Sequence, residues 1–463
     1  MTAKTTLPKI LVRSSVALVL LIAALAFALW IKPPDLLRVG ANYSAKIVCS
    51  NVFLAGRDPG EVLRLDVQAP GVALLRLMRV SVDRERHIVR AGLLGFIGDG
   101  LAVARPGLGC TVVPDGNLVT AMRYGAAPAD AAPADAPART DAVWPEGDAV
   151  ATTAALDRIL ADDALAGPGM RAIVVVEHGR IVAERYGAGF SAATPLLGWS
   201  MTKSVVAGLV GLALKDGRLS LDQPAGWPAG DDRARIRIAD LLSMSSGLHF
   251  NEAYGAVSDV TRMLYLEPDM AKFAREQPPE HPAGEFWSYS SGTANILARI
   301  VQDAAAPNGA AYPRERLFKP LGMTSATLET DATGTFVGSS YMYATARDWA
   351  RYGLFLAQGG VWRGQELLPS GYVAMMASPV AASGGQYGHG LVWLWGTDAI
   401  VPGKNPDAAF GIPADTFWME GHDGQSTAII PSREMVVVRL GLTPSRDHYQ
   451  PEPLIRALLN SQR

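Results

Sequence analysis

The sequence predicts an α+β protein in which the two ends of the main domain meet in one sheet. A strand hairpin is predicted at 172–186 and further strands at 416–440, whereas helical patterns dominate from about 220 to 330. The chain has 463 residues, enough for two or three domains, and a hydrophobic content of 49%, which is ordinary for a globular protein. A net charge of −2 without a Lys/Arg stripe argues against nucleic-acid binding.

The first 35 residues are expected to form an N-terminal membrane anchor or signal segment. Basic residues precede an uninterrupted apolar run, Val16–Ile31, and Lys32 follows it. This pattern directs export and leaves the body of the protein outside the cytoplasm. We expect an uncleaved anchor in the inner membrane with a periplasmic body, because Trp30 and Lys32 are typical of the membrane interface. Cleavage near Ala24–Ala28, which would release a secreted protein, is the alternative.

Residues 40–122 are predicted to form a small accessory domain, and 123–150 an Ala/Pro/Asp-rich linker. Alternating or short apolar segments predict strands at Cys49–Phe53, Leu63–Val67, Val80–Asp83, Ile88–Ala91 and Leu108–Val113. Cys49 and Cys110 are the only cysteines, and in an oxidising compartment we predict that they form a disulfide. Two buried free thiols are the alternative.

The main domain is expected to begin near residue 151 with a hairpin that has His178 at its tip, as a turn residue. Helical patterns follow at 200–215, 238–242, 293–301 and 345–356, the last capped by Thr345. Apolar segments then predict strands at 391–395, 416–420, 426–430 and 435–440, and a final helix is predicted at 452–459.

The chemical hypothesis starts from Ser200-Met201-Thr202-Lys203, at the beginning of the apolar helix. Residues three apart share one face of a helix, so Ser200 and Lys203 are expected to lie together. A hydroxyl beside a partly desolvated amine becomes a nucleophile when the amine is neutral. Lys203 is the only lysine with a serine three residues before it. The alternative is a serine that caps the helix and a lysine on the surface.

Two further motifs follow in order, Tyr289-Ser290-Ser291-Gly292 and, between two apolar strands, Gly421-His422-Asp423-Gly424-Gln425. With Ser-x-x-Lys, they resemble the motifs of the serine β-lactamase and penicillin-binding-protein superfamily, on its class C β-lactamase-like branch, over about 150–460. Within it, Ser-Met-Thr-Lys and Gly-His-Asp-Gly-Gln most resemble those of 6-aminohexanoate-dimer (nylon oligomer) hydrolase-like proteins.

The resemblance implies a β-lactamase/DD-peptidase-like fold for 151–463, with an antiparallel sheet flanked by helices and an inserted helical domain. It implies that Ser200 is the nucleophile, that Lys203 is the base and that Tyr289 relays protons, with the charge of Lys203 favouring the phenolate. It also places an oxyanion hole at the backbone N–H groups of Ser200 and Gln425. Gly424 would let a substrate approach the strand edge.

Three residues depart from the family pattern: Ser291 stands in place of Asn, His422 in place of Lys, and Asp423 in place of Thr or Ser. These changes weaken the case for β-lactamase or carboxypeptidase activity and favour an esterase or small-amide hydrolase. Ser291, His422 and Gly424 are expected to bind substrate. Tyr254 resembles the loop tyrosine of nylon-oligomer hydrolases and is expected to do the same, although isolated tyrosines and histidines more often only pack or face solvent.

The sequence therefore predicts an exported serine hydrolase that cleaves a small-molecule amide or ester through an acyl-enzyme on Ser200. No metal or other cofactor is expected, because metal-binding and nucleotide-binding motifs do not occur in the sequence. The alternative is a penicillin-binding or acylated sensor module with little or no turnover. A structural envelope protein with a coincidental Ser-x-x-Lys is the third reading.

Overall fold

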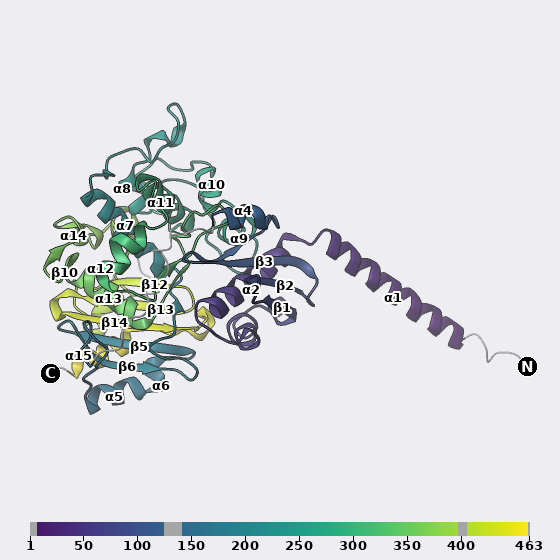
Figure 1. The fold of residues 1–463 in the computed structure, drawn as a ribbon, viewed down its shortest axis with the longest axis horizontal. Coiled ribbons are helices and arrows are strands. Elements are labelled where there is room, and N and C mark those ends of the chain that lie inside the picture. The colour runs from purple at the N-terminus through teal and green to yellow at the C-terminus, as the bar shows by residue number, and fades with distance from the viewer. Residues whose placement is uncertain (1–6, 125–140, 397–404, 462–463) are drawn as a thin grey trace, which may run out of the picture.

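The computed structural model describes residues 7–124, 141–396 and 405–461. A five-stranded antiparallel sheet lies at its centre, in the order β12-β13-β14-β5-β6 (Figure 1). Its strands are β5 Met170–Glu177, β6 Arg180–Tyr186, β12 Phe417–Gly421, β13 Gln425–Ile430 and β14 Met435–Gly441. Because β14 pairs with β5, with Val438 opposite Val174, both ends of the domain meet in this sheet, as predicted.

Helices cover both faces of the sheet (Figure 1). One face carries α7 Met201–Lys215 and α13 Ala346–Ala357, and the other carries α5 Ala154–Ala161, α6 Asp163–Ala166 and α15 Glu452–Asn460. Side chains alternate along each strand, so Val174 and Val438 join the core that contains α7, whereas Ile173 and Val437 join the core under α5 and α15. Three layers result, with the sheet in the middle.

Besides α7, the inserted region between β6 and β12 contains further helical segments and only short strands. The further helical segments are η4 Asp232–Arg235, α8 Ile238–Leu242, α9 Asp259–Leu266, α10 Met270–Arg275, α11 Ser291–Ala304, η5 Arg314–Phe318, α12 Lys319–Leu321, α13, α14 Tyr372–Met376, η6 Ala381–Ser383 and η7 Pro406–Phe410. Its short strands are β7 Leu196–Leu197, β8 Thr327–Leu328, β9 Met342–Ala344, β10 Val361–Trp362 and β11 Gln365–Glu366. Two single turns, η8 Pro431–Arg433 and η9 Ser445–Asp447, lie nearer the C-terminus. The expected cap of α13 is present, since the Thr345 side chain accepts a hydrogen bond from the Asp348 amide.

The predicted strand at 391–395 is wrong. Only Trp393 pairs there, in single bridges to Tyr387 and Trp418. Leu391 has a positive φ of 56°, a conformation that a strand excludes. The apolar residues of this segment are buried by packing without joining the sheet.

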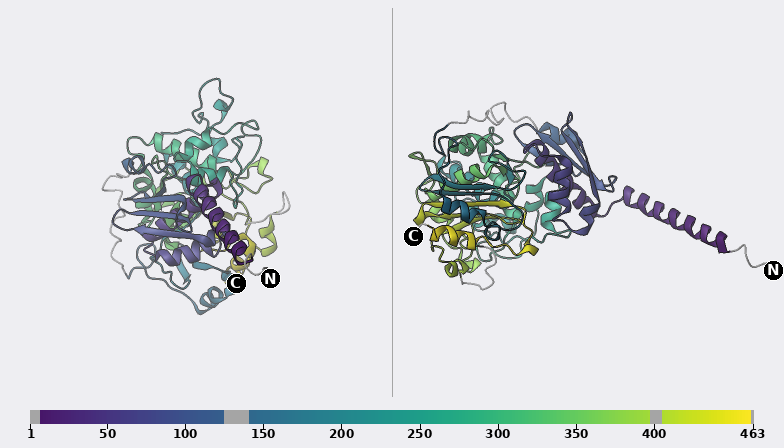
Figure 2. Two further views of the ribbon diagram at one scale, coloured as in Figure 1. Left: turned by 90° about the vertical axis from the view of Figure 1, so that its right-hand side faces the viewer. Right: turned by 90° about the horizontal axis from the view of Figure 1, so that it is seen from below.

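Residues 35–123 form a separate layer between the main domain and α1 Leu7–Ile31 (Figure 2). The layer contains helix α2 and a four-stranded antiparallel sheet in the order β1-β2-β3-β4. Its elements are α2 Asp35–Phe53, α3 Pro59–Val62, η1 Leu63–Gln68, η2 Ala73–Leu77, β1 Met78–Asp83, β2 Ile88–Leu93, β3 Ile97–Arg105, β4 Gly109–Val112 and α4 Leu118–Arg123. The Ala/Pro/Asp tract expected as a linker falls on 125–140, outside the described residues.

Two strand predictions in this layer are wrong. Residues 49–53 belong to the C-terminal end of α2. A segment of five residues is too short to distinguish the period of a helix from that of a strand. Residues 63–67 form the π-helical turn η1. In η1 Leu63 and Val67 are buried while Leu65, between them, is partly exposed; a strand would have placed all three on one face.

The predicted disulfide between Cys49 and Cys110 is present, with 6.0 Å between the two Cα atoms. It joins α2 to β4, and both residues are fully buried. A disulfide together with an N-terminal apolar helix suggests an extracytoplasmic protein.

Charged and polar bonds fix the layer to the main domain. Lys46 of α2 forms a buried ion pair with Glu329, and Glu329 also accepts hydrogen bonds from Ser50 and from the amide of Cys110. The side chains of Lys46 and Glu329 are 1% and 0% exposed. Asp66 of η1 pairs with Arg171 of β5 at 2.6 Å. The layer is therefore packed into the molecule and is not loosely attached.

Within the described residues, α1 is the one helix long and apolar enough to cross a membrane, over Ser14–Ile31. The 18 residues of this apolar stretch, Ser14–Ile31, would span roughly 27 Å, close to the ~30 Å hydrocarbon core of a bilayer. Apolar side chains along this helix, such as Val19, Leu20 and Leu21, are exposed in the isolated chain.

Candidate active site

Ser200 lies at the N-terminus of α7, where its side chain makes no capping hydrogen bond. The residue before it, Trp199, has a positive φ of 48°, an uncommon conformation for a large side chain. The preceding carbonyl oxygen, of Gly198, lies so close to Gly421 of β12 that a β-carbon there would be 2.2 Å from it. The start of α7 is therefore held against the end of β12, and the Ser200 hydroxyl is left available.

The Lys203 side chain is buried, with 1% of the residue exposed, so it is not a surface lysine. Its Nζ donates to Ser200 Oγ at 3.0 Å, to Ser291 Oγ at 3.1 Å and to the Ser339 carbonyl at 2.9 Å. Burial lowers the pKa of Lys203 to about 8, and the negative charge of Glu252 opposes this effect. An amine with this pKa loses its proton just above neutral pH, as a general base for Ser200 must.

Tyr289 directly precedes α11, and its ring is held among other aromatic rings. It stacks on Trp393 with 5.4 Å between ring centroids and meets the edge of Tyr387. Its hydroxyl interacts with Ser200, and Lys203 Nζ lies 4.8 Å from its ring centroid. Burial raises the pKa of Tyr289 far above its ordinary value, and the Glu252 charge raises it further. This direction of the shift favours the protonated tyrosine over the phenolate that was expected.

Glu252 is a component of the site that the sequence did not reveal. Its carboxylate accepts hydrogen bonds from the backbone N–H of Ser291, at 2.8 Å, and from the Ser291 hydroxyl. The Ser291 hydroxyl thus lies between the Lys203 amine and a carboxylate. A lysine in an apolar stretch indicates that an anion lies nearby, because a buried charge is usually paired. Spacing along the chain does not indicate which carboxylate is that anion.

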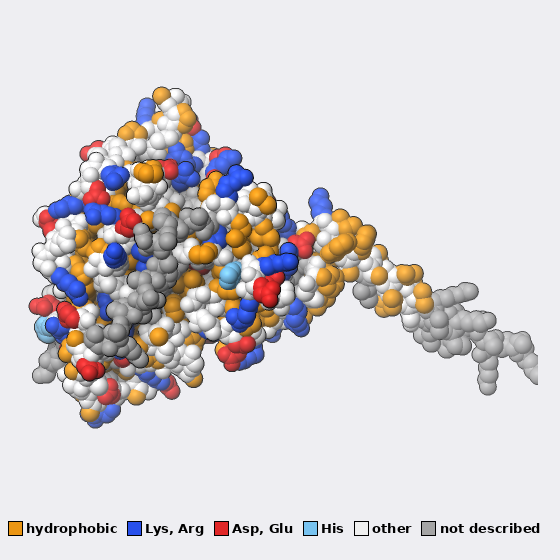
Figure 3. Space-filling view, in the orientation of Figure 1, with side chains coloured by type: hydrophobic (Ala, Val, Ile, Leu, Met, Phe, Trp, Pro, Cys, Tyr) orange, Lys and Arg blue, Asp and Glu red, His pale blue; other side chains and the backbone are white. Residues whose placement is uncertain are grey.

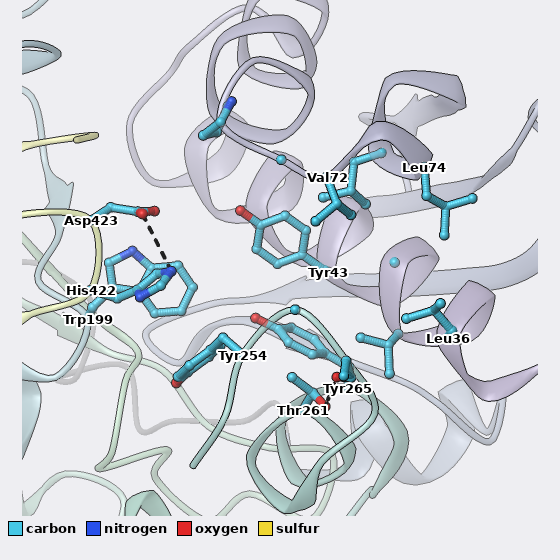
Figure 4. A pocket seen from close by; sticks show the side chains of 17 residues that line it. Leu36, Tyr43, Val72, Leu74, Trp199, Tyr254, Thr261, Tyr265, His422 and Asp423 are labelled. Atoms are coloured by element: carbon cyan, nitrogen blue, oxygen red, sulfur yellow. Dashed lines mark hydrogen bonds and ion pairs between the residues drawn. The ribbon is translucent and has the colours of Figure 1, made fainter. Parts of the chain in front are cut away.

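His422 and Tyr254 come together beside Trp199 (Figure 4). The Tyr254 and His422 rings are stacked with 4.8 Å between centroids, and Trp199 meets His422 edge-on at 5.5 Å. Asp423 Oδ1 lies 3.4 Å from His422 Nε2. Tyr254 also interacts with the Ser291 hydroxyl. The structure therefore places Tyr254, His422 and Ser291 around one centre with Ser200, Lys203 and Tyr289.

Gly424 is the last residue of the tight turn between β12 and β13, and Gln425 begins β13. Gly424 has a φ of +77°, and the space where its side chain would lie is occupied by Arg439 and Thr443. The turn and Arg439 account for a glycine at this position, and its contact with substrate stays a prediction. The Gln425 side chain binds the backbone of Gly441 through both of its polar atoms, which anchors the turn.

The site combines a serine hydroxyl, a buried amine of lowered pKa and a tyrosine hydroxyl, which are the kinds of group that acyl transfer requires. Within residues 7–124, 141–396 and 405–461, no group of three or more His, Cys, Asp or Glu side chains is arranged to hold a metal ion. The chemistry proposed for these residues needs none.

Comparison with known proteins agrees with this geometry. A model of the Beta-lactamase family matches residues 156–458. The chain is 25% identical over 302 residues to the 6-aminohexanoate-dimer hydrolase of Paenarthrobacter ureafaciens, covering 60% of this chain and 73% of that protein. A solved structure from Bacillus anthracis, provisionally described as a 6-aminohexanoate-dimer hydrolase, matches with a TM-score of 0.54 and 22% identity over 66% of this chain and 81% of that one. The penicillin binding protein from Bacillus halodurans matches with a TM-score of 0.50 and 16% identity, over 66% of this chain and all of that one (100%). Residues 35–123 lie outside the stretch that the family model matches.

Proposed function

Because the chain belongs to the Beta-lactamase family, we propose that it is an exported serine hydrolase that cleaves an amide or ester through an acyl-enzyme on Ser200. One observation carries this proposal: the buried Lys203 amine lies 3.0 Å from the Ser200 hydroxyl, and its pKa is lowered to about 8. Such a pair activates a serine without a histidine.

In the proposed first step, neutral Lys203 takes the Ser200 proton as Oγ bonds to the substrate carbonyl carbon. The carbonyl π electrons move to oxygen, and the backbone N–H groups of Ser200 and Gln425 are proposed to stabilise this oxyanion. Collapse of the intermediate breaks the bond to the leaving nitrogen or oxygen, which takes the Tyr289 proton. The proton held by Lys203 then restores the tyrosine.

In the proposed second step, water attacks the acyl carbonyl and gives its proton to Lys203 as the second tetrahedral intermediate forms. Collapse then breaks the bond to Ser200 Oγ, which recovers its proton from Lys203, and the carboxylic acid product leaves. The rings packed around Tyr289 keep its hydroxyl directed at Ser200.

The groups around Ser200 favour an ester or small amide over a penicillin. Ser291 is occupied by Lys203 and Glu252, so it does not offer the amide contact that asparagine supplies at this motif. Asp423 lies beside His422, and its negative charge disfavours an anionic substrate group at this position. Similarity to a 6-aminohexanoate-dimer hydrolase is in keeping with a small amide.

The test uses the full-length protein and three probes: a fluorophosphonate, p-nitrophenyl butyrate and a penicillin. We expect a fluorophosphonate adduct on the peptide that contains Ser200, sustained ester turnover and no penicilloyl adduct, as measured by mass spectrometry and absorbance. Ser200→Ala should abolish both labelling and turnover, whereas the matched control Ser191→Ala, on an exposed turn, should abolish neither. One equivalent of product without further turnover would instead favour the sensor function, and labelling of Ser200→Ala would refute the proposed nucleophile.

The pH profile tests the roles of Lys203 and Glu252 together. Because the base must be neutral, kcat/KM of the free enzyme should rise with pH through an inflection near the Lys203 pKa of about 8. The Glu252 charge raises the pKa of Lys203, so Glu252→Gln should move the inflection to lower pH, by roughly one pH unit. If Glu252 only caps α11, the variant will change the value of kcat/KM at high pH and leave the pH of the inflection unchanged. Asp259→Asn, on the adjacent helix α9, is the matched control.

A further inference from the structure

An apolar cavity leads from the proposed active site to the segment that follows α1. At one end it is lined by Trp199, Tyr254 and His422, and at the other by Leu36, Val72 and Leu74 (Figure 4). Its volume is about 200 Å³, more than the ~150 Å³ of an apolar cavity that accommodates benzene. Ser200 does not itself line the cavity; the inner end reaches Trp199, which directly precedes Ser200, and Tyr254, which interacts with the Ser291 hydroxyl.

Residues 35–123 supply about half of this lining, from α2 to η2, including Tyr43 and Leu75. These residues lie outside the stretch shared with the Beta-lactamase family. Apolar side chains predominate among them, so the layer adds a hydrophobic surface beside a site that is itself polar. A cavity of this kind selects ligands by the apolar area they bury.

The outer end of the cavity lies next to the base of α1. Leu36 is five residues beyond Ile31, so the backbone keeps it within roughly 18 Å of the end of that helix, whichever direction the helix takes. Leu36 and Val72 are 44% and 53% exposed. Leu77, Leu94 and Phe96 of the same layer are also about half exposed. Figure 3 shows hydrophobic side chains along α1 and on the neighbouring surface at its base.

These observations place an apolar opening within roughly 18 Å of the end of the helix that is expected to anchor the protein in a membrane. We propose that the cavity receives the aliphatic chain of an amphiphilic ester or amide that enters from this membrane, an inference that rests on the proposed function. The chain lies along Leu74, Val72 and Leu36, and the ester or amide group reaches Ser200 past the stacked rings of Tyr254 and His422.

The first test measures how kcat/KM of the full-length protein depends on acyl length, with p-nitrophenyl acetate, butyrate, hexanoate and octanoate. Burial of each added methylene group should raise kcat/KM roughly two- to fourfold. Val72→Asp, at the exposed outer end, should remove most of this gain for octanoate and leave acetate unchanged. Val119→Asp is the matched control, because Val119 is 74% exposed and does not line the cavity.

The second test distinguishes a chain that enters from the membrane from one that enters from water. Full-length protein is reconstituted in phosphatidylcholine vesicles with p-nitrophenyl dodecanoate, and the surface density of the ester is lowered by adding lipid at constant bulk concentration. Entry from the membrane predicts a rate that falls in proportion to surface density. A rate that follows only the bulk concentration would overturn this part of the proposal.

The outcomes also separate this inference from the proposed function. If acetate is hydrolysed but kcat/KM does not increase with acyl length, or if Val72→Asp and Val119→Asp behave alike, the cavity proposal is refuted and the hydrolase remains. If no ester is hydrolysed and no fluorophosphonate adduct forms on Ser200, the hydrolase itself is refuted.

Discussion

Replacing Lys203 with methionine is expected to lower kcat/KM for p-nitrophenyl butyrate by roughly a thousandfold, within the range usual for loss of a general base. Methionine is similar in length to lysine and fills the same buried space without a charge. It cannot accept the Ser200 proton, and Tyr289, which also interacts with Ser200, has a raised pKa that disfavours its acting as the base. Steady-state kinetics and the rate of fluorophosphonate labelling should fall together.

Lys215→Met is the matched control for this variant. Lys215 ends the same helix, but it is partly exposed and pairs with Glu366 away from Ser200. The Lys215→Met variant should retain full activity. Circular dichroism and thermal unfolding would establish that Lys203→Met is folded. A folded Lys203→Met protein that keeps more than about a tenth of the activity would rule out Lys203 as the base.

Lys46→Met is expected to destabilise the protein by about 3–5 kcal/mol, because it leaves the Glu329 carboxylate buried without a cation. Burial lowers the pKa of Lys46, and the charge and hydrogen bond of Glu329 oppose this shift. For a chain of this size, we expect the midpoint of thermal unfolding to fall by roughly 5–10 °C.

The double variant Lys46→Met with Glu329→Gln should recover most of this loss, since a buried pair replaced as a whole costs far less than a broken one. Lys215→Met, which removes one partner of an exposed pair, should change stability by less than about 1 kcal/mol. If the double variant is as unstable as Lys46→Met, the defect comes from lost packing around α2 and not from an uncompensated charge.

The ion pair between Lys46 and Glu329 also positions part of the cavity wall. Lys46 and Tyr43 lie within one turn of each other on α2, so the bond to Glu329 holds the helix that forms part of the cavity wall. Asp66, bonded to Arg171, fixes η1 in the same way. The contacts that attach residues 35–123 to the main domain thus also position the apolar lining beside Trp199.

The elements predicted correctly from the sequence are those that depend on neighbours along the chain. The spacing of Ser200 and Lys203 places them on one helix face, and short apolar segments predict β5, β6, β13 and β14. Short segments were ambiguous: Leu63–Val67 alternates like a strand, yet Leu63 and Val67 also lie four apart, and packing selected a helical turn. Burial by the surrounding structure decided between the two periods.

The sequence by itself determined the order of the three motifs, the presence of only two cysteines and the apolar N-terminal run, all of which are local or countable features. Only the tertiary structure decided that Glu252 supplies the anion near Lys203, that the Ser339 carbonyl completes its hydrogen bonds and that Leu36 and Trp199 line one cavity. The physical reason is separation along the chain: these groups meet through side-chain packing between distant segments, and no spacing rule connects them.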